Sequence, residues 1–232
     1  MRIDIISIFP KMFEPVLGES IIKRAQAKGL VKIKVHDLRS FTLNKHKKVD
    51  DRPYGGGPGM VMGPQPIFSA VKKIKAKAKS GKVRVILLSP KGKTLTQNVA
   101  KKLTKEKHLI LICGHYEGVD ERVREYLVND EISIGDYILT GGELPAMVLL
   151  DSIIRLVPKV LGKDTSNVVE SFEDNLLEYP QYTRPESFNS YKVPKVLLSG
   201  DHKKICDWRK MQSLKVTKLK RPDLLKKQLN KK

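Results

Sequence analysis

The chain has 232 residues, of which 40% are hydrophobic, so it is long and apolar enough to bury a core and is not a disordered protein. Lys and Arg total 45 against 25 acidic residues, and the net charge of +20 favours a polyanionic partner such as a nucleic acid. Because Lys far outnumbers Arg, a lysine-rich surface without such a partner stays open as an alternative. Two cysteines, Cys113 and Cys206, are too few for a disulfide framework and fit a reducing compartment.

The beginning of the chain, MRIDIISIFPKMF, lacks the long apolar segment of a secretory signal and predicts a strand instead. No apolar run reaches the length that a membrane-spanning helix needs. We therefore expect a cytoplasmic protein without a membrane partner.

The first two-thirds of the chain alternate between strand and helix patterns. In chain order we expect a strand over residues 2–9, a helix over 12–28, a strand over 31–38, a polar and glycine-rich loop over 39–58, a helix over 64–79, a strand over 83–88, a helix over 94–104, a strand over 108–113, a helix over 119–128, a short strand at Ile132 and Ile134, and an apolar helix over 144–157. This alternation predicts an α/β fold, with a mostly parallel sheet that helices cover on both faces.

The pattern changes after Pro158. Residues 161–186 are polar and interrupted by prolines, which predicts a linker. Helical spacing returns in two strongly basic segments, residues 201–215 and 222–228. We therefore expect one domain over residues 1–160, an interdomain linker over 161–186 and a basic helical domain over 187–232.

Three expected strands run into loops that contain glycine: SPKGK, GHYEGVDER and GDYILTGG. Ligands of open parallel sheets bind outside the carboxyl ends of the strands, and glycine lets the backbone approach a ligand closely. We expect residues 89–92, 114–118 and 135–142 to line one pocket, although each segment could instead be an ordinary turn.

These loops contain no phosphate-binding GxxxxGK[ST] pattern and no GxSxG nucleophile elbow. The five histidines are scattered and have no zinc-type spacing, so we expect no metal site. The residues alone predict a mostly uncharged small ligand that backbone groups hold.

Several long motifs occur in order along the chain: DDRPYGGGPGMVM, LLSPKG, CGHYEGVDERV, ISIGDYILTGGELPAMVLLDSIIRLVPKVLG, ESFEDNLLEYPQYTRP and SGDHKKICDWRKMQSL. In this combination the sequence resembles the bacterial tRNA (guanine-N1)-methyltransferase family, TrmD, of the SPOUT superfamily. The resemblance covers almost the whole chain. It implies a SPOUT-type α/β sheet with a deep trefoil knot, followed by a small all-helical domain.

The resemblance further implies that the three loops form the knot and bind S-adenosylmethionine, and it leaves open whether Mg²⁺ takes part. The reaction it implies is methylation of N1 of the guanine at tRNA position 37, just 3′ of the anticodon. The positions that match the cofactor contacts of the family are Leu88, Ser89, Pro90, Gly92, Gly114, Tyr116, Glu117, Ile134, Gly135, Asp136, Tyr137, Ile138, Leu139, Gly141, Gly142 and Pro145.

Methylation of guanine N1 requires a group that removes the N1 proton and a group that stabilises charge on O6. The family places an Asp at the start of its DSF segment, where this chain has Glu170. We expect Glu170 to be the general base, with Glu173 and Asp174 as alternatives, and Arg155 to stabilise O6. A solvated linker acid and a surface arginine are the alternative interpretations.

The resemblance also implies contacts with the tRNA substrate. Asp51, Tyr54 and Gly59 belong to the loop that helps to hold the target guanine in the family. Arg184 in YPQYTRP, with Lys203 and Arg209 in the basic segment, are suited to contact RNA phosphates.

We also expect a homodimer with composite active sites. The helix expected over residues 144–157 is apolar over more of its surface than one packed face requires. Glu170 lies beyond a linker, so it need not return to its own knot, and the resemblance implies the same arrangement. The alternative function is a non-catalytic RNA-binding protein that has retained the fold.

Overall fold

The computed structural model describes residues 1–78, 81–161 and 170–229. The chain divides into two compact units, Met1–Gly162 and Lys163–Lys232, called here the N-terminal unit and the C-terminal unit. Residues 162–169 of the expected linker and residue 79 of an expected helix lie outside the described residues.

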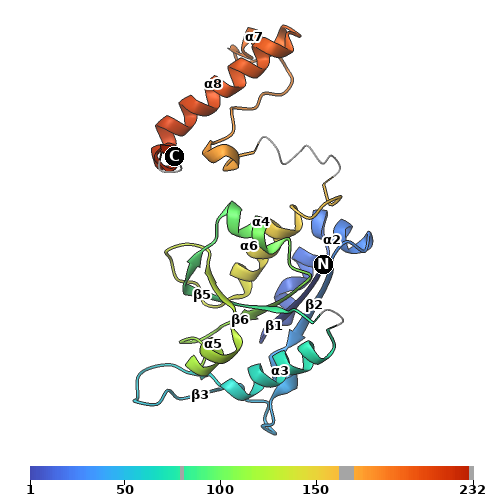
Figure 1. Ribbon diagram of the computed structural model, residues 1–232, viewed down its shortest axis with the longest axis vertical. Coiled ribbons are helices and arrows are strands. Elements are labelled where there is room, and N and C mark those ends of the chain that lie inside the picture. The colour runs from blue at the N-terminus through green and yellow to red at the C-terminus, as the bar shows by residue number, and fades with distance from the viewer. Residues whose placement is uncertain (79–80, 162–169, 230–232) are drawn as a thin grey trace. The chain divides into compact units, whose positions relative to one another are not determined.

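A parallel sheet forms the centre of the N-terminal unit (Figure 1). Within the described ranges it has five strands, in the order β2 (Lys32–Asp37), β1 (Arg2–Ser7), β6 (His108–Cys113), β5 (Arg84–Thr94) and β7 (Asp130–Ser133). Every neighbouring pair runs parallel. The expected α/β fold with a parallel sheet is confirmed.

Helices cover both faces of this sheet (Figure 1). On one face lie α2 (Ser20–Ala27), α4 (Gln97–Leu103) and α6 (Glu143–Ile154). On the other face lie α3 (Pro64–Ala76) and α5 (Glu121–Leu127). Parallel strands with both faces covered are buried, which explains why β6 is buried along its length and apolar after His108.

Alternation along β1 supplies side chains to both hydrophobic clusters. Ile3 and Ile5 pack in the cluster that includes α2, α4 and α6. Ile6 packs in the cluster that includes α3 and α5. Because successive side chains of a strand point to opposite faces, one apolar strand can be buried on both sides.

The helix expected over residues 12–28 is interrupted. The segment contains η1 (Pro10–Phe13), α1 (Glu14–Leu17) and then α2. Ser20, where α2 begins, has a φ of 51°, in the left-handed region. A continuous right-handed helix needs a negative φ at every residue, so the prediction of one helix is wrong here.

β5 is longer than expected and continues through the whole of the predicted SPKGK loop, to Thr94. Leu88 and Lys93 both pair with Ile132 of β7, so the register shifts between them. Residues 89–92 therefore form an irregular section within the strand rather than a separate turn, as a bulge does.

The polar segment after β2 contains η2 (Leu38–Phe41) and a two-stranded antiparallel ribbon. The ribbon pairs β3 (Asp50–Asp51) with β4 (Val61–Met62). The ribbon therefore encloses the glycine-rich residues 52–60 as a loop with fixed ends.

An all-helical C-terminal domain is expected from the family resemblance, but the structure shows a short β-hairpin there, so this expectation is wrong. Residues 187 and 188 pair with residues 191 and 192 in an antiparallel hairpin, which two-residue periodicity over so few residues cannot reveal. The elements of this unit are η3 (Glu173–Asn175), β8 (Ser187–Phe188), β9 (Tyr191–Lys192), α7 (Lys195–Leu198), α8 (His202–Lys220) and α9 (Pro222–Leu229).

Among the described residues of both units, no helix is both long enough and apolar enough to cross a membrane.

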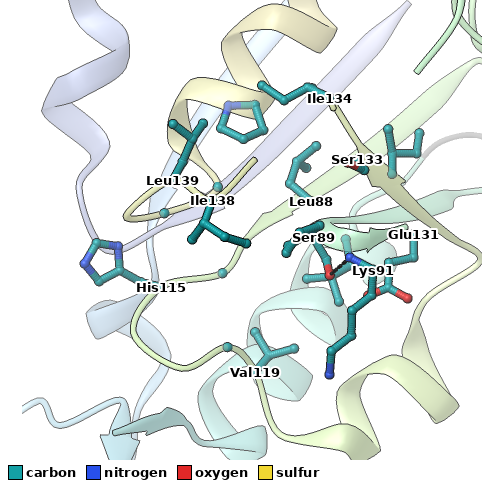
Figure 2. Close-up of a pocket in the computed structure, with 18 of the residues that line it drawn as sticks. Leu88, Ser89, Lys91, His115, Val119, Glu131, Ser133, Ile134, Ile138 and Leu139 are labelled. Atoms are coloured by element: carbon teal, nitrogen blue, oxygen red, sulfur yellow. Dashed lines mark hydrogen bonds between the residues drawn. The ribbon is translucent and has the colours of Figure 1, made fainter. Parts of the chain in front are cut away.

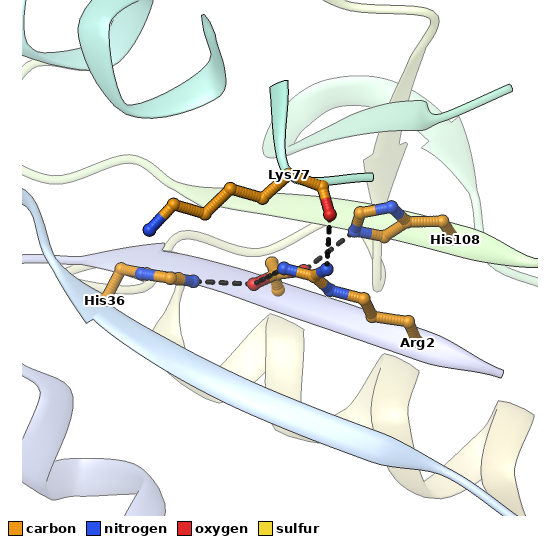
Figure 3. Close-up of polar contacts among 5 residues, drawn as sticks. Arg2, His36, Lys77 and His108 are labelled. Atoms are coloured by element: carbon orange, nitrogen blue, oxygen red, sulfur yellow. Dashed lines mark hydrogen bonds and ion pairs between the residues drawn. The ribbon is translucent and has the colours of Figure 1, made fainter. Parts of the chain in front are cut away.

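A buried carboxylate joins three strands of the sheet. Asp4 on β1 is fully buried, and its Oδ1 lies 2.6 Å from Nε2 of His36 on β2 (Figure 3). Its Oδ2 lies 2.7 Å from Nε2 of His108 on β6 and accepts from Arg2 Nε at 2.6 Å. Arg2 Nη1 also donates to the carbonyl of Lys77, just after α3, at 3.3 Å. The Asp4 cluster thus ties β1 to β2, β6 and the end of α3.

We predict that Asp4→Asn lowers the free energy of unfolding at pH 7 by about 3 kcal/mol, because it removes one partner of a buried ion pair. Burial alone would raise the pKa of Asp4, but hydrogen bonds with His36, Arg2 and His108 outweigh it and hold this pKa well below its ordinary 3.8. A depressed pKa adds stability above the unfolded-state value, and this stability is lost as the pH falls towards the folded-state value.

The free energies of unfolding of the wild type and of Asp4→Asn, measured in urea, should therefore show the whole difference at pH 7. This difference should shrink below about pH 4. An equal difference at pH 3 and at pH 7 would contradict the assigned role of the carboxylate.

Candidate functional site

The structure brings the three glycine-containing segments together around one cavity of about 330 Å³, which lies at the carboxyl ends of β6 and β7 and beside the irregular section of β5. This volume lies within the range of small-molecule sites. The lining residues include most of the positions named from the family resemblance: Leu88, Ser89, Pro90, Gly114, Tyr116, Glu117, Ile134, Gly135, Tyr137, Ile138, Leu139, Gly141, Gly142 and Pro145.

Apolar side chains from different segments meet in this cavity. Leu88 comes from β5, just before its irregular section, whereas Ile138 and Leu139 come from the segment between β7 and α6, and all three lie around the middle of the cavity (Figure 2). The charged side chains that line it are three acids and two bases, namely Glu117, Glu121, Glu131, Lys91 and Arg124. A mostly apolar cavity with an excess of carboxylates suits a ligand that combines a ring system with a positive charge.

Glycine is required here where one chain segment lies on another. A Cβ at Gly142 would lie 2.8 Å from Cys113 Cα, and the Gly142 N–H donates to the Gly114 carbonyl at 2.7 Å. A Cβ at Gly92 would lie 2.4 Å from the carbonyl carbon of Glu131. We had expected glycine to admit a ligand, but these two glycines instead admit the backbone of a neighbouring segment.

Two positions named from the resemblance do not line the cavity. Gly92 packs on the backbone of β7, and Asp136 is exposed. The sequence-based assignment of direct cofactor contact is therefore not supported by the cavity at these two residues.

A second cavity of about 650 Å³ adjoins the first, because Val119 and Glu121 line both. Asp51 and Tyr54 of the glycine-rich loop line this second cavity. Gly59 lies instead against the side chain of Glu117, which lines the first cavity, since a Cβ at Gly59 would be 2.4 Å from Glu117 Oε1. The loop expected to hold the substrate thus lies beside the residues expected to hold the cofactor.

The two expected catalytic residues belong to different units. Arg155 is the half-buried C-cap residue of α6 in the N-terminal unit. Glu170 is half-buried in the C-terminal unit, and the alternative base Asp174 is exposed there in η3. The third candidate, Glu173, is also in η3.

In the C-terminal unit the YPQYTRP segment lies along α8. The Arg209 guanidinium is 4.8 Å from the centre of the Tyr179 ring, and the rings of Tyr182 and Trp208 are 6.4 Å apart. Arg184 and Arg209 both line a cavity of about 770 Å³ between these segments. Lys203 is exposed on α8, which also carries Arg209. Arg184 lies in the segment beside this helix.

Two polar residues at this site were not named individually from the sequence, although His115 lies within residues 114–118, which are expected to line the pocket. His115 lines the cavity, and Glu143, the first residue of α6, is buried. The available signal was an acidic residue at the start of the otherwise apolar helix ELPAMVLL. Among the described residues, no three or more His, Cys, Asp or Glu side chains are grouped so as to bind a metal ion.

Comparison with known proteins extends over nearly the whole chain. The profile of the family described as tRNA (guanine-1)-methyltransferase TrmD matches residues 1–227. A tRNA (guanine-N(1)-)-methyltransferase of Geobacillus kaustophilus (strain HTA426) is 60% identical over 225 residues, which cover 97% of this chain and 91% of the relative. The protein of the same name from Clostridioides difficile (strain 630) is 54% identical over 227 residues, which cover 98% of each chain. The chain therefore belongs to the tRNA (guanine-N1)-methyltransferase family, TrmD.

Proposed function

We propose that the protein transfers a methyl group from S-adenosylmethionine to N1 of a guanine in tRNA, at position 37 just 3′ of the anticodon. The observation that carries this proposal is the mostly apolar cavity of about 330 Å³, built from three strand-end segments in a member of this family. The excess of carboxylates around it fits a sulfonium cation. When bound, S-adenosylmethionine supplies an already activated, electrophilic methyl group.

Different residues of the N-terminal unit would bind different parts of S-adenosylmethionine. Leu88, Ile134 and Leu139 offer apolar surface for a purine ring, and Glu117 offers a carboxylate for a positive charge. Backbone groups of the 135–142 segment supply the remaining polar contacts.

We infer that these segments form the trefoil knot of the SPOUT superfamily. Knots are rare, because a chain end must pass through a loop. Where two segments of a knot lie backbone to backbone, no side chain can stand between them. The glycine contacts of Gly142 on Cys113 and of Gly92 on Glu131 support such close crossings.

The chemistry requires a base and a charge stabiliser. Guanine N1 carries a proton at neutral pH, and Glu170 would accept it as the methyl group bonds to N1. Arg155 would donate hydrogen bonds to O6 while negative charge shifts onto it. General-base catalysis contributes about 10²–10⁴-fold, and alignment of the reactants a comparable or larger factor.

We propose that the active site is shared between two chains of a homodimer. The helix α6 buries Ala146 and Leu149, yet Leu144 and Val148 on its other side are 50% and 47% exposed. These two apolar residues are four apart, so they lie on one face of the helix. An exposed apolar helix face beside a cavity fits a partner subunit.

The C-terminal unit would then hold the tRNA. The exposed residues Lys203, Lys204, Arg209 and Lys210 lie along α8. Their contacts with phosphates would fix the position of the tRNA without reading its sequence.

We predict that Gly114→Leu abolishes S-adenosylmethionine binding without unfolding the protein. A Cβ at Gly114 would meet its nearest atoms, on Val119 and Leu88, at 3.7 and 3.9 Å, so the backbone tolerates a side chain. A larger side chain would occupy the cavity that these residues line. At a hundredfold excess over Kd the cofactor should stabilise the wild type by about 2.7 kcal/mol and should leave Gly114→Leu unchanged in a thermal shift assay.

Gly114→Ala is the matched control, because its single methyl group leaves most of the cavity open. It should keep the thermal shift. If the wild type shows no shift at millimolar cofactor, this cavity is not the cofactor site.

We predict that the wild type methylates tRNA transcripts with G at position 37 and not those with A, and that Glu170→Gln slows the transfer by about 10²-fold or more. The amide keeps the shape of the side chain but loses its basicity. Cofactor affinity should stay near the wild-type value. Transfer of labelled methyl groups at saturating cofactor measures the rate, and normal turnover of Glu170→Gln would place the base elsewhere.

Failure of the wild type to methylate any transcript while it still binds tRNA would instead favour the alternative, a non-catalytic RNA-binding protein. The conservative variant Glu170→Asp restores the residue type of the family at this position. It should therefore be at least partly active.

We predict that two inactive variants, Gly114→Leu and Glu170→Ala, complement each other when they are refolded together. In a mixed dimer one site combines both lesions and the other combines both intact halves. Random pairing gives half heterodimers, each with one good site, so about a quarter of the wild-type activity should return. If subunit exchange occurs, as shown by mass spectrometry of differently labelled chains, and activity stays absent, each site is built within one chain.

A further inference from the structure

A buried carboxylate lies directly behind the cavity. Glu143 is 2% exposed, and its Oε1 accepts a hydrogen bond from Ser7 Oγ at 2.7 Å. Ser7 Oγ in turn accepts from the Phe9 N–H at 2.8 Å. The single hydroxyl proton of Ser7 is therefore directed to Glu143. The N-terminus of α6, where Glu143 is the first residue, further favours a negative charge at this place.

A buried imidazole nitrogen lies opposite this carboxylate. His115 Nδ1 is shielded from solvent and has no hydrogen-bond partner among the described residues. It is 4.0 Å from Glu143 Oε2, which is too far for a hydrogen bond. The ring is held edge-on by Phe9 at 5.1 Å and by Tyr116 at 4.8 Å. A buried polar atom without a partner is costly, so its retention calls for an explanation.

Gly141 lies against both polar atoms. A Cβ at this position would be 2.4 Å from Glu143 Oε2 and 2.5 Å from His115 Nδ1. Gly141 also pairs with His115 in an isolated antiparallel bridge, and it lines the cavity. The position of the Gly141 backbone is therefore coupled to the distance between Nδ1 and Oε2.

On the basis of the proposed function, we propose that Glu143 and His115 are positioning residues for the methyl donor. A hydrogen bond between His115 Nδ1 and Glu143 Oε2 forms when the donor fills the cavity, and it holds the Gly141 backbone in the shape that the donor requires. The two atoms need to approach by about 1 Å, which places them at ordinary hydrogen-bond distance. Because the acceptor is a carboxylate in a dry site, the bond is stronger than one between neutral groups.

Two conservative variants separate this role from a merely structural one. Glu143→Gln keeps the side-chain shape and an acceptor for Ser7 but loses the charge. His115→Phe keeps the ring between Phe9 and Tyr116 but loses Nδ1. Each variant should weaken S-adenosylmethionine binding by about tenfold in calorimetry, the usual size of one hydrogen bond to a charged group. The melting temperature without ligand and kcat at saturating cofactor should stay close to wild type, so the change falls on KM.

The double variant tests whether the two residues act as a pair. If they share one hydrogen bond, Glu143→Gln combined with His115→Phe should again weaken binding by about tenfold rather than a hundredfold. His115→Asn places an amide near the position of Nδ1, so it should recover part of the affinity that His115→Phe loses. Losses that multiply in the double variant, or an unchanged affinity in both single variants, would overturn the proposal.

Asp4→Asn is the matched control, because it changes another buried carboxylate on the opposite face of the sheet and away from the cavity. It should lower the melting temperature and leave cofactor affinity unchanged.

A measurement on the wild type tests the hydrogen bond directly and does not depend on whether a variant folds. In the wild type labelled with ¹⁵N-histidine, the Nδ1 resonance of His115 should shift when S-adenosylmethionine is added. A resonance that stays in place while the cofactor binds would overturn the pairing. A wild type that does not bind the cofactor at all would overturn the proposed function first.

Discussion

The contact between the 135–142 segment and the end of β6 is the constraint on which the cavity depends. The Gly142 N–H donates to the Gly114 carbonyl at 2.7 Å, and a Cβ at position 142 would lie 2.8 Å from Cys113 Cα. Only glycine fits at such a distance, so two segments far apart in the chain are held backbone to backbone. α6 begins directly after Gly142, and the contact therefore sets where this helix starts. The contact therefore holds two of the three segments that line the cavity, residues 114–118 and 135–142, against each other.

β1 carries polar anchors on both faces of the sheet. Asp4 interacts with His36 and His108 on the side of α3, whereas Ser7 donates to Glu143 on the side of α6. Buried carboxylates are tolerated when hydrogen bonds replace the lost water. The Asp4 cluster satisfies its carboxylate fully and makes a rigid joint between strands. The Glu143 group lies beside the cavity, where a histidine nitrogen stays without a partner among the described residues.

Specific residues explain where sequence reasoning failed. The φ of 51° at Ser20 breaks a helix whose apolar spacing continues across it, because periodicity reports burial and not backbone conformation. Gly92 was assigned to a ligand, yet its missing side chain makes room for β7. The pairing of β8 with β9 involves two residues on each strand, too few for an alternating pattern to be visible. Each failure concerns a contact between segments or a single dihedral angle.

The sequence by itself determined the α/β class, the parallel sheet and the three segments around the cavity, because buried strands and glycine-bearing strand ends leave local patterns. Its long motifs also determined the family. Only the tertiary structure decided that Gly142 lies against the backbone of Cys113 and Gly114, and that His115 and Glu143 face each other behind Gly141. These relations join residues that are separated in the chain and meet only when the segments pack together. Local propensity and periodicity carry no information about such distances, since packing alone brings the atoms together.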